Sequence, residues 1–261
     1  RLAVSAAFFL SGALVGVWAS RIPAVAGALD LSKTTLGLLL LCIAAGAIIS
    51  FPLAGWGSDK FGAARLTRIL AAFYCATLLV VAIAPNVWVL AVALLFFGAG
   101  HGALDVAMNT WAAAVERKMG KAIMSSFHAI FSLGAGVGAA AGYGAVAFDL
   151  SVPVHFLLAV ILLGGPVGWL VMVPWQDLPP GAQKKAPLFA LPKGPLVAVG
   201  IMALCASMGE GAMTDWSAIF LIAVGGVTEA KAALGYAVFS AAMVAMRLMG
   251  DRLVGRFGMV G

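Results

Sequence analysis

Charged residues are scarce in this chain of 261 residues. Asp, Glu, Lys and Arg together make up 10% of it, whereas hydrophobic residues make up 63% and the mean hydropathy is +1.08. Soluble globular domains carry roughly 25% charged residues and about 45–50% apolar residues. The composition therefore excludes an ordinary soluble domain and favours an integral membrane protein.

Cysteine and histidine are also rare, with three of each. Cys42, Cys75 and Cys205 lie in separate apolar segments without paired or metal-ligand spacing, and we expect them to be packing residues. No histidine pair has metal-ligand spacing, and no nucleophile accompanies an oriented base. The sequence therefore predicts no metal site, no cofactor and no enzyme activity, including an intramembrane enzyme built on Asp105, His101 and His128.

The apolar runs have the length of membrane-spanning helices. A helix needs about 20 apolar residues to cross roughly 30 Å of hydrocarbon, and the ten-residue alternation of a membrane barrel is absent. We expect an all-α polytopic membrane protein in which eight spans cover residues 2–22, 34–54, 66–84, 87–115, 122–147, 153–174, 195–223 and 231–250.

Basic residues are distributed unevenly between the expected loops. Thirteen of the sixteen Lys and Arg residues, Arg247 among them, fall on one side of the expected membrane, and only Arg21, Lys33 and Lys231 fall on the other. Because cytoplasmic loops carry an excess of Lys and Arg, this asymmetry predicts a cytoplasmic N-terminus. It also explains the net charge of +6 without a nucleic-acid partner.

A polar stripe runs along the fourth span. His101, Asp105, Asn109 and Glu116 project within roughly 80° of one another on a helix. An ionised carboxylate facing lipid would cost about 3 kcal/mol, so the stripe must face protein or a wet cavity. Asp105 is therefore a candidate functional residue, with His101 and Asn109 beside it. The alternative is that Asn109 and His101 only hydrogen-bond neighbouring helices and that a basic partner neutralises Asp105.

The seventh span carries a second acid near its centre. Glu210 lies between Gly209 and Gly211, which suggests a locally loosened helix beside a cavity. Thr214 projects within about 40° of Glu210 on a helix. Glu210 is therefore the second candidate functional acid, with Thr214 on the same face of the helix.

Two further residues have a functional and a structural interpretation. Arg21 lies near the outer end of the first span, where Pro23 can kink or end the helix. It is either a cavity cation that binds an anionic group or pairs with a carboxylate, or an anchor that reaches the membrane interface. His128 is either a solute contact or a packing residue.

A polar turn, GWGSDKFGAARLTR, joins the second and third spans at residues 55–68. Its glycines permit close approach and a positive φ, and its acid can complement a helix dipole. We expect a polar clamp at the cytoplasmic face. Its residues are Gly55, Asp59, Lys60, Gly62 and Arg65, with Glu116 as an ion-pair partner at the inner end of the stripe.

The only long polar and proline-rich break separates two halves. Residues 175–194 contain four prolines and are expected to form a cytoplasmic linker. At an offset of 196 residues, Arg256-Phe257-Gly258 falls on Lys60-Phe61-Gly62. We expect a six-helix bundle over 1–174, the linker over 175–194, and the first two helices of a second bundle over 195–261.

These features together resemble the major facilitator superfamily. Gly55, Asp59, Lys60 and Gly62 match its signature between helices 2 and 3, although Ala63 stands where a basic residue is expected. The segments LDVAMN, VERKMGK, SSFHAIFSLGAGVG and EGAMTDWSAIFL resemble a bacterial inner-membrane subgroup near the fucose-permease and rhizopine-transporter-like proteins. The resemblance implies the major facilitator fold of twelve helices in two bundles, of which this chain has eight and is therefore expected to be a fragment.

The expected function is secondary active transport, with proton-coupled symport of a small polar solute such as a sugar or polyol. Asp105 and Glu210 would carry the proton, and His101, Asn109, Arg21, His128 and Thr214 would contact the solute. The partners are the solute, the proton and the lipid bilayer, with no nucleic acid. The alternatives are an efflux antiporter for hydrophobic compounds, whose signature proline is missing from the fifth span, and a non-transporting sensor on the same scaffold.

Overall fold

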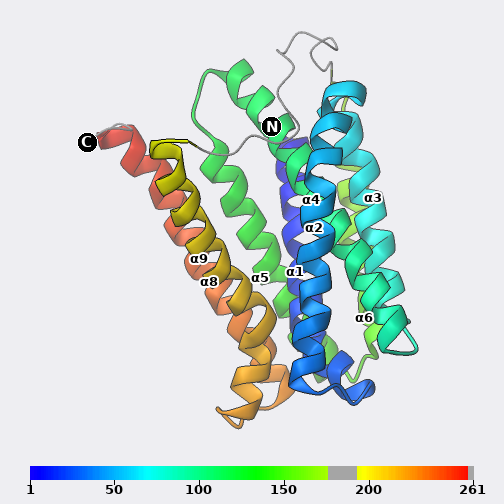
Figure 1. Cartoon of the computed structure of the whole chain (residues 1–261). Helices are drawn as coiled ribbons and strands as arrows, with labels where there is room; N and C mark the ends of the chain where they lie inside the picture. The colour runs from blue at the N-terminus through cyan, green and yellow to red at the C-terminus, as the bar shows by residue number, and fades with distance from the viewer. Residues whose placement is uncertain (176–192, 258–261) are drawn as a thin grey trace.

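The structure is a computed structural model that describes residues 1–175 and 193–257, and these residues are helical apart from short turns. Eight helices in the described part are long and apolar enough to cross a membrane, which confirms the predicted number and the all-α class. The helices, drawn in Figure 1, are α1 (Leu2–Ala28), α2 (Lys33–Phe61), α3 (Ala63–Ala82), α4 (Val87–Met119), α5 (Met124–Ala147), α6 (Val152–Ala159), the π-helix η1 (Val160–Gly164), α7 (Gly165–Leu170), α8 (Pro195–Ala223) and α9 (Glu229–Phe257). The segments α6, η1 and α7 together form one span.

Successive spans run in alternate directions through the bundle. The N-terminus and the end of α9 therefore lie at the same end of the molecule, which we name the terminal end (Figure 1). The turns after α1, α3, α5 and α8 lie at the opposite end. Residues 176–192 hold most of the expected linker and lie outside the described part, so the division into two bundles stays a prediction.

Two predicted boundaries are wrong. Helix α1 continues through Pro23 to Ala28 instead of ending near residue 22. Helix α2 continues to Phe61, so most of the polar segment expected to be a turn at 55–68 is helical. The chain reverses at Gly62 alone, whose φ of 88° is favourable only for glycine.

Glycines let two helix pairs pack backbone to backbone. A Cβ atom added to Gly138 of α5 would lie 2.1 Å from the carbonyl oxygen of Ala13 in α1. A Cβ atom added to Gly98 of α4 would lie 2.0 Å from the carbonyl oxygen of Ile43 in α2. Only small residues allow helices to approach this closely in a membrane, so α1–α5 and α2–α4 form the tightly packed framework of the first half.

Two turns at the end opposite the termini share one conformation. Asp30 after α1 and Asp149 after α5 have φ values of 48° and 53°, and each is followed by Leu and Ser. In both turns the Leu amide donates to a carbonyl five residues back, at 2.9 and 2.8 Å. Asp tolerates the left-handed conformation that closes a helix in this way.

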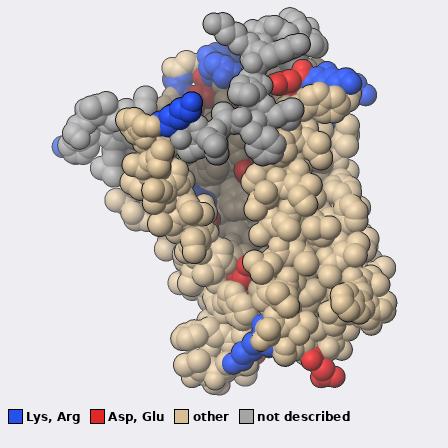
Figure 2. Space-filling view, in the orientation of Figure 1, with Lys and Arg blue, Asp and Glu red and all other residues tan. Residues whose placement is uncertain are grey.

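Helices α8 and α9 form a separate layer against α5 and α1. They lie apart from α2 toward the terminal end and approach it at the opposite end (Figure 1). There, the Trp216 ring of α8 lies 3.8 Å from the position that a Cβ atom of Gly37 in α2 would occupy. The space-filling view in Figure 2 shows a recess between α8–α9 and α2, with acidic side-chain atoms in its wall. We name this recess the central hollow.

Candidate functional site

An arginine joins three helices in the middle of the bundle. Arg247 of α9 donates through Nη2 to both carboxylate oxygens of Glu210 in α8, at 3.0 and 2.9 Å. Its Nη1 donates to the carbonyl oxygen of His128, at 3.1 Å, and to Ser132 Oγ, both in α5. We name these four residues the Arg247 network. It contains the ion pair between Arg247 and Glu210 and ties α9 and α8 to the first half.

The position of Arg247 differs from the sequence prediction. We expected it at the cytoplasmic end of the last span, 231–250, but α9 continues for ten residues beyond it to Phe257. A signal for this was present, because Glu210 at the centre of an apolar helix requires a neutralising partner. The helix around Glu210 was also mispredicted: α8 is uninterrupted at Gly209 and Gly211, so the glycines do not loosen it.

The second mid-span acid has a different environment. Asp105 of α4 is half-buried, and Asn109 one turn later donates through Nδ2 to its carboxylate oxygen at 3.0 Å and to its carbonyl oxygen at 2.9 Å. In the described residues no cation forms an ion pair with Asp105. Asp105 is thus paired with Asn109 of its own helix, and the basic partner of the alternative interpretation is not seen among those residues.

The two other candidates near Asp105 lie on either side of it. The His101 ring, one turn earlier in α4, packs 5.5 Å from the Tyr74 ring of α3 and 6.3 Å from the Phe131 ring of α5. His128 of α5 packs edge-on against Phe8, at 5.2 Å. Both histidines interact electrostatically with Asp105, and His128 also interacts with Glu210 and Arg247. The two mid-span acids therefore share one polar region around α5.

Thr214, one turn after Glu210 in α8, extends this region. Its Oγ1 donates to the Glu210 carbonyl oxygen, at 2.9 Å, and shares a hydroxyl–hydroxyl hydrogen bond with Tyr236 Oη of α9, at 3.1 Å. Tyr236 is buried and packs against Ala19, Ala135 and other small residues of α1 and α5. Sequence reasoning missed Tyr236, since a single tyrosine in an apolar helix carries no spacing signal.

Arg21 is not placed as a cavity cation. Its side chain is only 6% exposed, and Nη2 donates to the carbonyl oxygen of Leu150 in the turn between α5 and α6, at 2.9 Å. This bond fixes α1 to the repeated turn that contains Asp149. Arg21 therefore makes a buried structural bond, which differs from both interpretations of this residue, the cavity cation and the interfacial anchor.

The expected polar clamp is only partly assembled. Glu116 accepts hydrogen bonds through Oε2 from the backbone amides of Ile123 and Met124, both at 2.8 Å, so it caps α5 instead of forming the expected ion pair. The exposed Lys60 ammonium lies 4.7 Å from the centre of the Trp56 ring. Gly55 is helical, Gly62 makes the turn, and Asp59 and Arg65 are exposed on either side of it.

An arginine that was not among the predicted clamp residues forms hydrogen bonds to the backbone at this face. Arg68 of α3 donates to the carbonyl oxygens of Val171 and Val173, at 2.8 and 2.7 Å. The Trp175 ring packs against Trp111 of α4, at 6.2 Å. These contacts fix the chain that leaves α7 onto α3 and α4.

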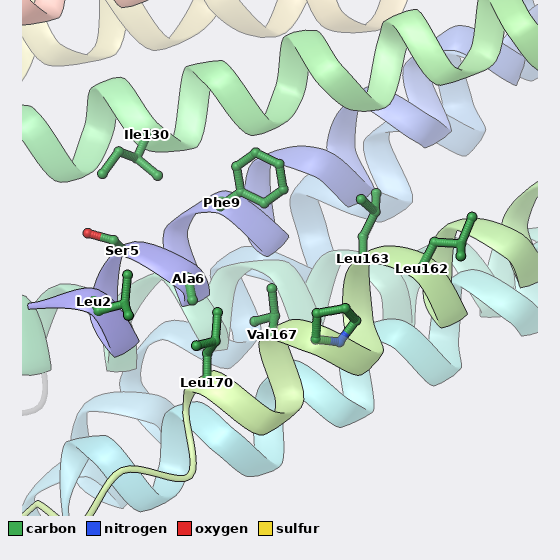
Figure 3. A pocket seen from close by; sticks show the side chains of 10 residues that line it. Leu2, Ser5, Ala6, Phe9, Ile130, Leu162, Leu163, Val167 and Leu170 are labelled. Atoms are coloured by element: carbon green, nitrogen blue, oxygen red, sulfur yellow. The ribbon is translucent and has the colours of Figure 1, made fainter.

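A separate apolar crevice lies between α1, α5 and the η1–α7 segment, with a volume of about 330 Å³ (Figure 3). Its walls are hydrocarbon side chains such as Phe9, Ile130 and Leu163, with Ser5 as the polar exception. Ile130 lies two residues from both His128 and Ser132, and thus on the opposite face of α5 from the Arg247 network. The crevice cannot hydrogen-bond a polar solute as the central region can. In the described residues there is also no group of three His, Cys, Asp or Glu side chains that could hold a metal ion.

This fold, with paired polar groups at the centre of long apolar helices, defines a polytopic helical membrane protein of the transporter class. The sequence profile of the Major Facilitator Superfamily matches residues 4–260. The chain belongs to this superfamily, as its resemblance predicted.

Named relatives support the same class. The chain is 46% identical to the transporter y4wD of Sinorhizobium fredii over 98% of its own length, 36% identical to an MFS-type transporter of Yersinia pestis over 97%, and 32% identical to the membrane protein MosC of Rhizobium meliloti over 98%. It covers 68%, 65% and 62% of those proteins, so it spans about two thirds of their length.

Solved structures confirm the fold. Two structures of the nucleoside transporter NupG, one of them a mutant, match 98% and 99% of the chain with TM-scores of 0.71 and 0.68. The chain covers 68% of each of them, at 14% and 15% identity. Similarity at this level of identity establishes the major facilitator fold and no shared substrate.

Proposed function

We propose that the protein is a secondary active transporter that moves a small polar solute, such as a sugar or a polyol, together with a proton. The observation that carries this proposal is the contrast between its two mid-span acids. Asp105 has an amide partner and no ion pair in the described residues, whereas Glu210 is neutralised by Arg247. An acid without a cation in a membrane span is suited to binding and releasing a proton.

The neighbouring polar groups are suited to a hydroxyl-rich solute. Asn109, His101, His128 and Thr214 offer amide, imidazole and hydroxyl groups around the two acids. We assign solute contacts to these four residues. Glu210 acts in this proposal mainly through the Arg247 network, as a coupling group between the halves.

The same proposal includes alternating access in a bacterial inner membrane. Residues 1–174 move as one body against the part that begins at residue 195, and the N-terminus and the linker over 175–194 lie in the cytoplasm. The tight α1–α5 and α2–α4 pairs support a rigid first half, and the network between α5, α8 and α9 supports a second part held by bonds that can be exchanged. Asp59, Lys60, Arg65 and Glu116 would gate the cytoplasmic face.

The test is proton movement in proteoliposomes that contain the full-length protein. Sugars, polyols and sugar acids are added in turn to wild type and to Asp105→Asn, with Asp149→Asn as the control because Asp149 is an exposed turn residue. We expect solute-driven proton entry in wild type and in the control, and none in Asp105→Asn. Solute exchange that survives in Asp105→Asn would show that binding is intact and coupling alone is lost.

Two other outcomes would contradict the proposal. Proton entry that persists in Asp105→Asn would transfer the coupling role to Glu210. An absence of proton movement with every solute would favour efflux or a non-transporting role.

A further inference from the structure

Two buried polar atoms, one of them a single helical turn from Asp105, have no hydrogen-bond partner among the described residues. They are Tyr74 Oη of α3 and His101 Nδ1 of α4. The Tyr74 side chain is 0% exposed, and the centres of the two rings are 5.5 Å apart. Both rings thus lie in one small region of the first half, on facing helices.

Such atoms rarely stay unpaired inside a protein. A buried hydroxyl or imidazole nitrogen without a partner destabilises the fold by about 1–3 kcal/mol. Buried water molecules commonly occupy these places and bond otherwise unsatisfied groups. A tyrosine hydroxyl can donate and accept, and an imidazole nitrogen can do either according to its tautomer, so one water can serve both.

We propose that a buried water molecule bridges Tyr74 Oη and His101 Nδ1 and fixes the His101 ring beside Asp105. Tyr74 is then a positioning residue, because it acts on Asp105 through the water and His101. The water site depends on Tyr74 and His101 alone. Its effect on proton binding rests on the function proposed above.

The surroundings isolate this site from bulk solvent. The Phe97 ring lies 4.7 Å from the Tyr74 ring, and the Phe131 ring lies 6.3 Å from the His101 ring. The helices α3 and α4 cross closely here, since a Cβ atom on Gly100 would lie 3.4 Å from the Tyr74 Cα atom. A water held between these rings would exchange slowly and hold the imidazole in one orientation.

Hydroxyl-radical footprinting by X-ray radiolysis tests the water directly, because radicals formed from a bound water oxidise the side chains beside it. The experiment uses the full-length protein in nanodiscs and follows Tyr74 by mass spectrometry. Phe127 is the matched control, since it is also aromatic and 0% exposed. We expect Tyr74 to be oxidised faster than Phe127 in wild type, and to lose this excess in His101→Phe. Equal rates for Tyr74 and Phe127 in wild type would overturn the proposal.

The thermal unfolding midpoint provides an independent test of the bound water. If the hydroxyl bonds a water, Tyr74→Phe lowers the unfolding midpoint by about 2–4 °C, the shift expected for one lost hydrogen bond. Tyr236→Phe, which removes the observed bond to Thr214, sets the scale. An unchanged or raised midpoint in Tyr74→Phe would contradict the proposal, because deleting an unpaired hydroxyl relieves the fold.

The positioning role has its own readout, the pH profile of solute-driven proton entry. The groups that bear on this profile are Asp105 on α4 itself, Tyr74 on α3, and His128 on α5 with the Arg247–Glu210 pair beyond it. We expect Tyr74→Phe to shift the pH of half-maximal entry and to retain the maximal rate. An unshifted profile would refute the positioning role. Absence of proton entry in wild type would refute the proposed function and leave the footprinting result to decide the water site.

Discussion

Helices α1 to α7, with η1, and the α8–α9 pair differ in the contacts that hold them. Close backbone packing joins helix pairs of the first half, and an ion-paired polar network is added where α8–α9 meets that half. Glycines bring α1 and α5 into backbone contact, whereas Gly209 and Gly211 of α8 have nothing within 4 Å of an added Cβ atom. The α8–α9 pair contacts the first half through the Arg247 network, through Trp216 and Tyr236, and through α9, which packs along α5 so closely that a Cβ atom on Gly136 would lie 3.3 Å from Ser240 Cβ.

This difference separates a framework from a part that can move. Close backbone packing has one geometry and tolerates no displacement, because any shift brings atoms into collision. Hydrogen bonds between polar side chains can be broken and replaced as partners or protons change. Within the first half the first means prevails, whereas α8–α9 combines packing of α9 on α5 with exchangeable polar bonds to that half.

Enlarging a glycine of the framework is expected to cause the largest loss of stability. Gly138→Leu would place a side chain where the α1 backbone already lies, 2.1 Å from the Ala13 carbonyl oxygen. Because the backbone cannot give way as a side chain would, we expect a loss of about 3 kcal/mol or more in the free energy of unfolding. The measurement is the yield and unfolding midpoint of the purified protein.

Gly144→Leu is the control in the same helix. An added Cβ atom at Gly144 meets nothing within 4 Å, and we expect this variant to fold and to retain its midpoint. If both variants lost the same stability, helix propensity instead of close packing would explain the glycines of α5.

A double-mutant cycle on Arg247 and Glu210 tests how strongly the Arg247 network contributes to stability. Arg247→Gln leaves the Glu210 carboxylate without its cation, and we expect a loss of about 2–3 kcal/mol together with lost transport. Glu210→Gln should lose less, because Arg247 keeps its bonds to Ser132 and to the His128 carbonyl oxygen. The double variant should be more stable than the sum of the two changes predicts, by about 0.5–3 kcal/mol.

The measurement for this cycle is chemical unfolding of all four proteins in one detergent. Strict additivity would show that the ion pair contributes nothing beyond its separate groups. The network would then not be the connection that holds α8–α9 against α5.

Much of the fold could be predicted because membrane helices are constrained by length and apolarity. The eight spans and their alternation follow from runs of about 20 residues. The errors arose where a proline or a polar residue did not end a helix: α1 passes Pro23, α2 continues through the polar segment to Phe61, and α9 continues for ten residues beyond Arg247. A charged residue near the end of an apolar run is consistent with both a loop and a buried pair, and only the tertiary partner Glu210 distinguishes them.

The candidate site was predicted where the signal was local. Asp105 and Asn109 lie one turn apart on the same helix, so their bond follows from helical spacing. The bonds of Arg21 to Leu150 and of Arg68 to Val171 join residues over 100 positions apart and involve backbone carbonyls. No residue type marks a carbonyl acceptor in a sequence, so these partners could not be foreseen.

The smallest expected effect is at Glu116, which lies at the terminal end of the framework. Its carboxylate caps α5 through the amides of Ile123 and Met124, two donors that have no helical partner of their own. Glu116→Ala should therefore cost about 1–2 kcal/mol in the free energy of unfolding, and Glu116→Gln, which keeps one neutral acceptor, less than that. The neighbouring Arg117→Ala changes an exposed residue and should lie within about 0.5 kcal/mol of wild type. If Glu116→Ala kept its stability and lost only transport, the residue would belong to a gate that exchanges partners, and the fixed framework would end before residue 116.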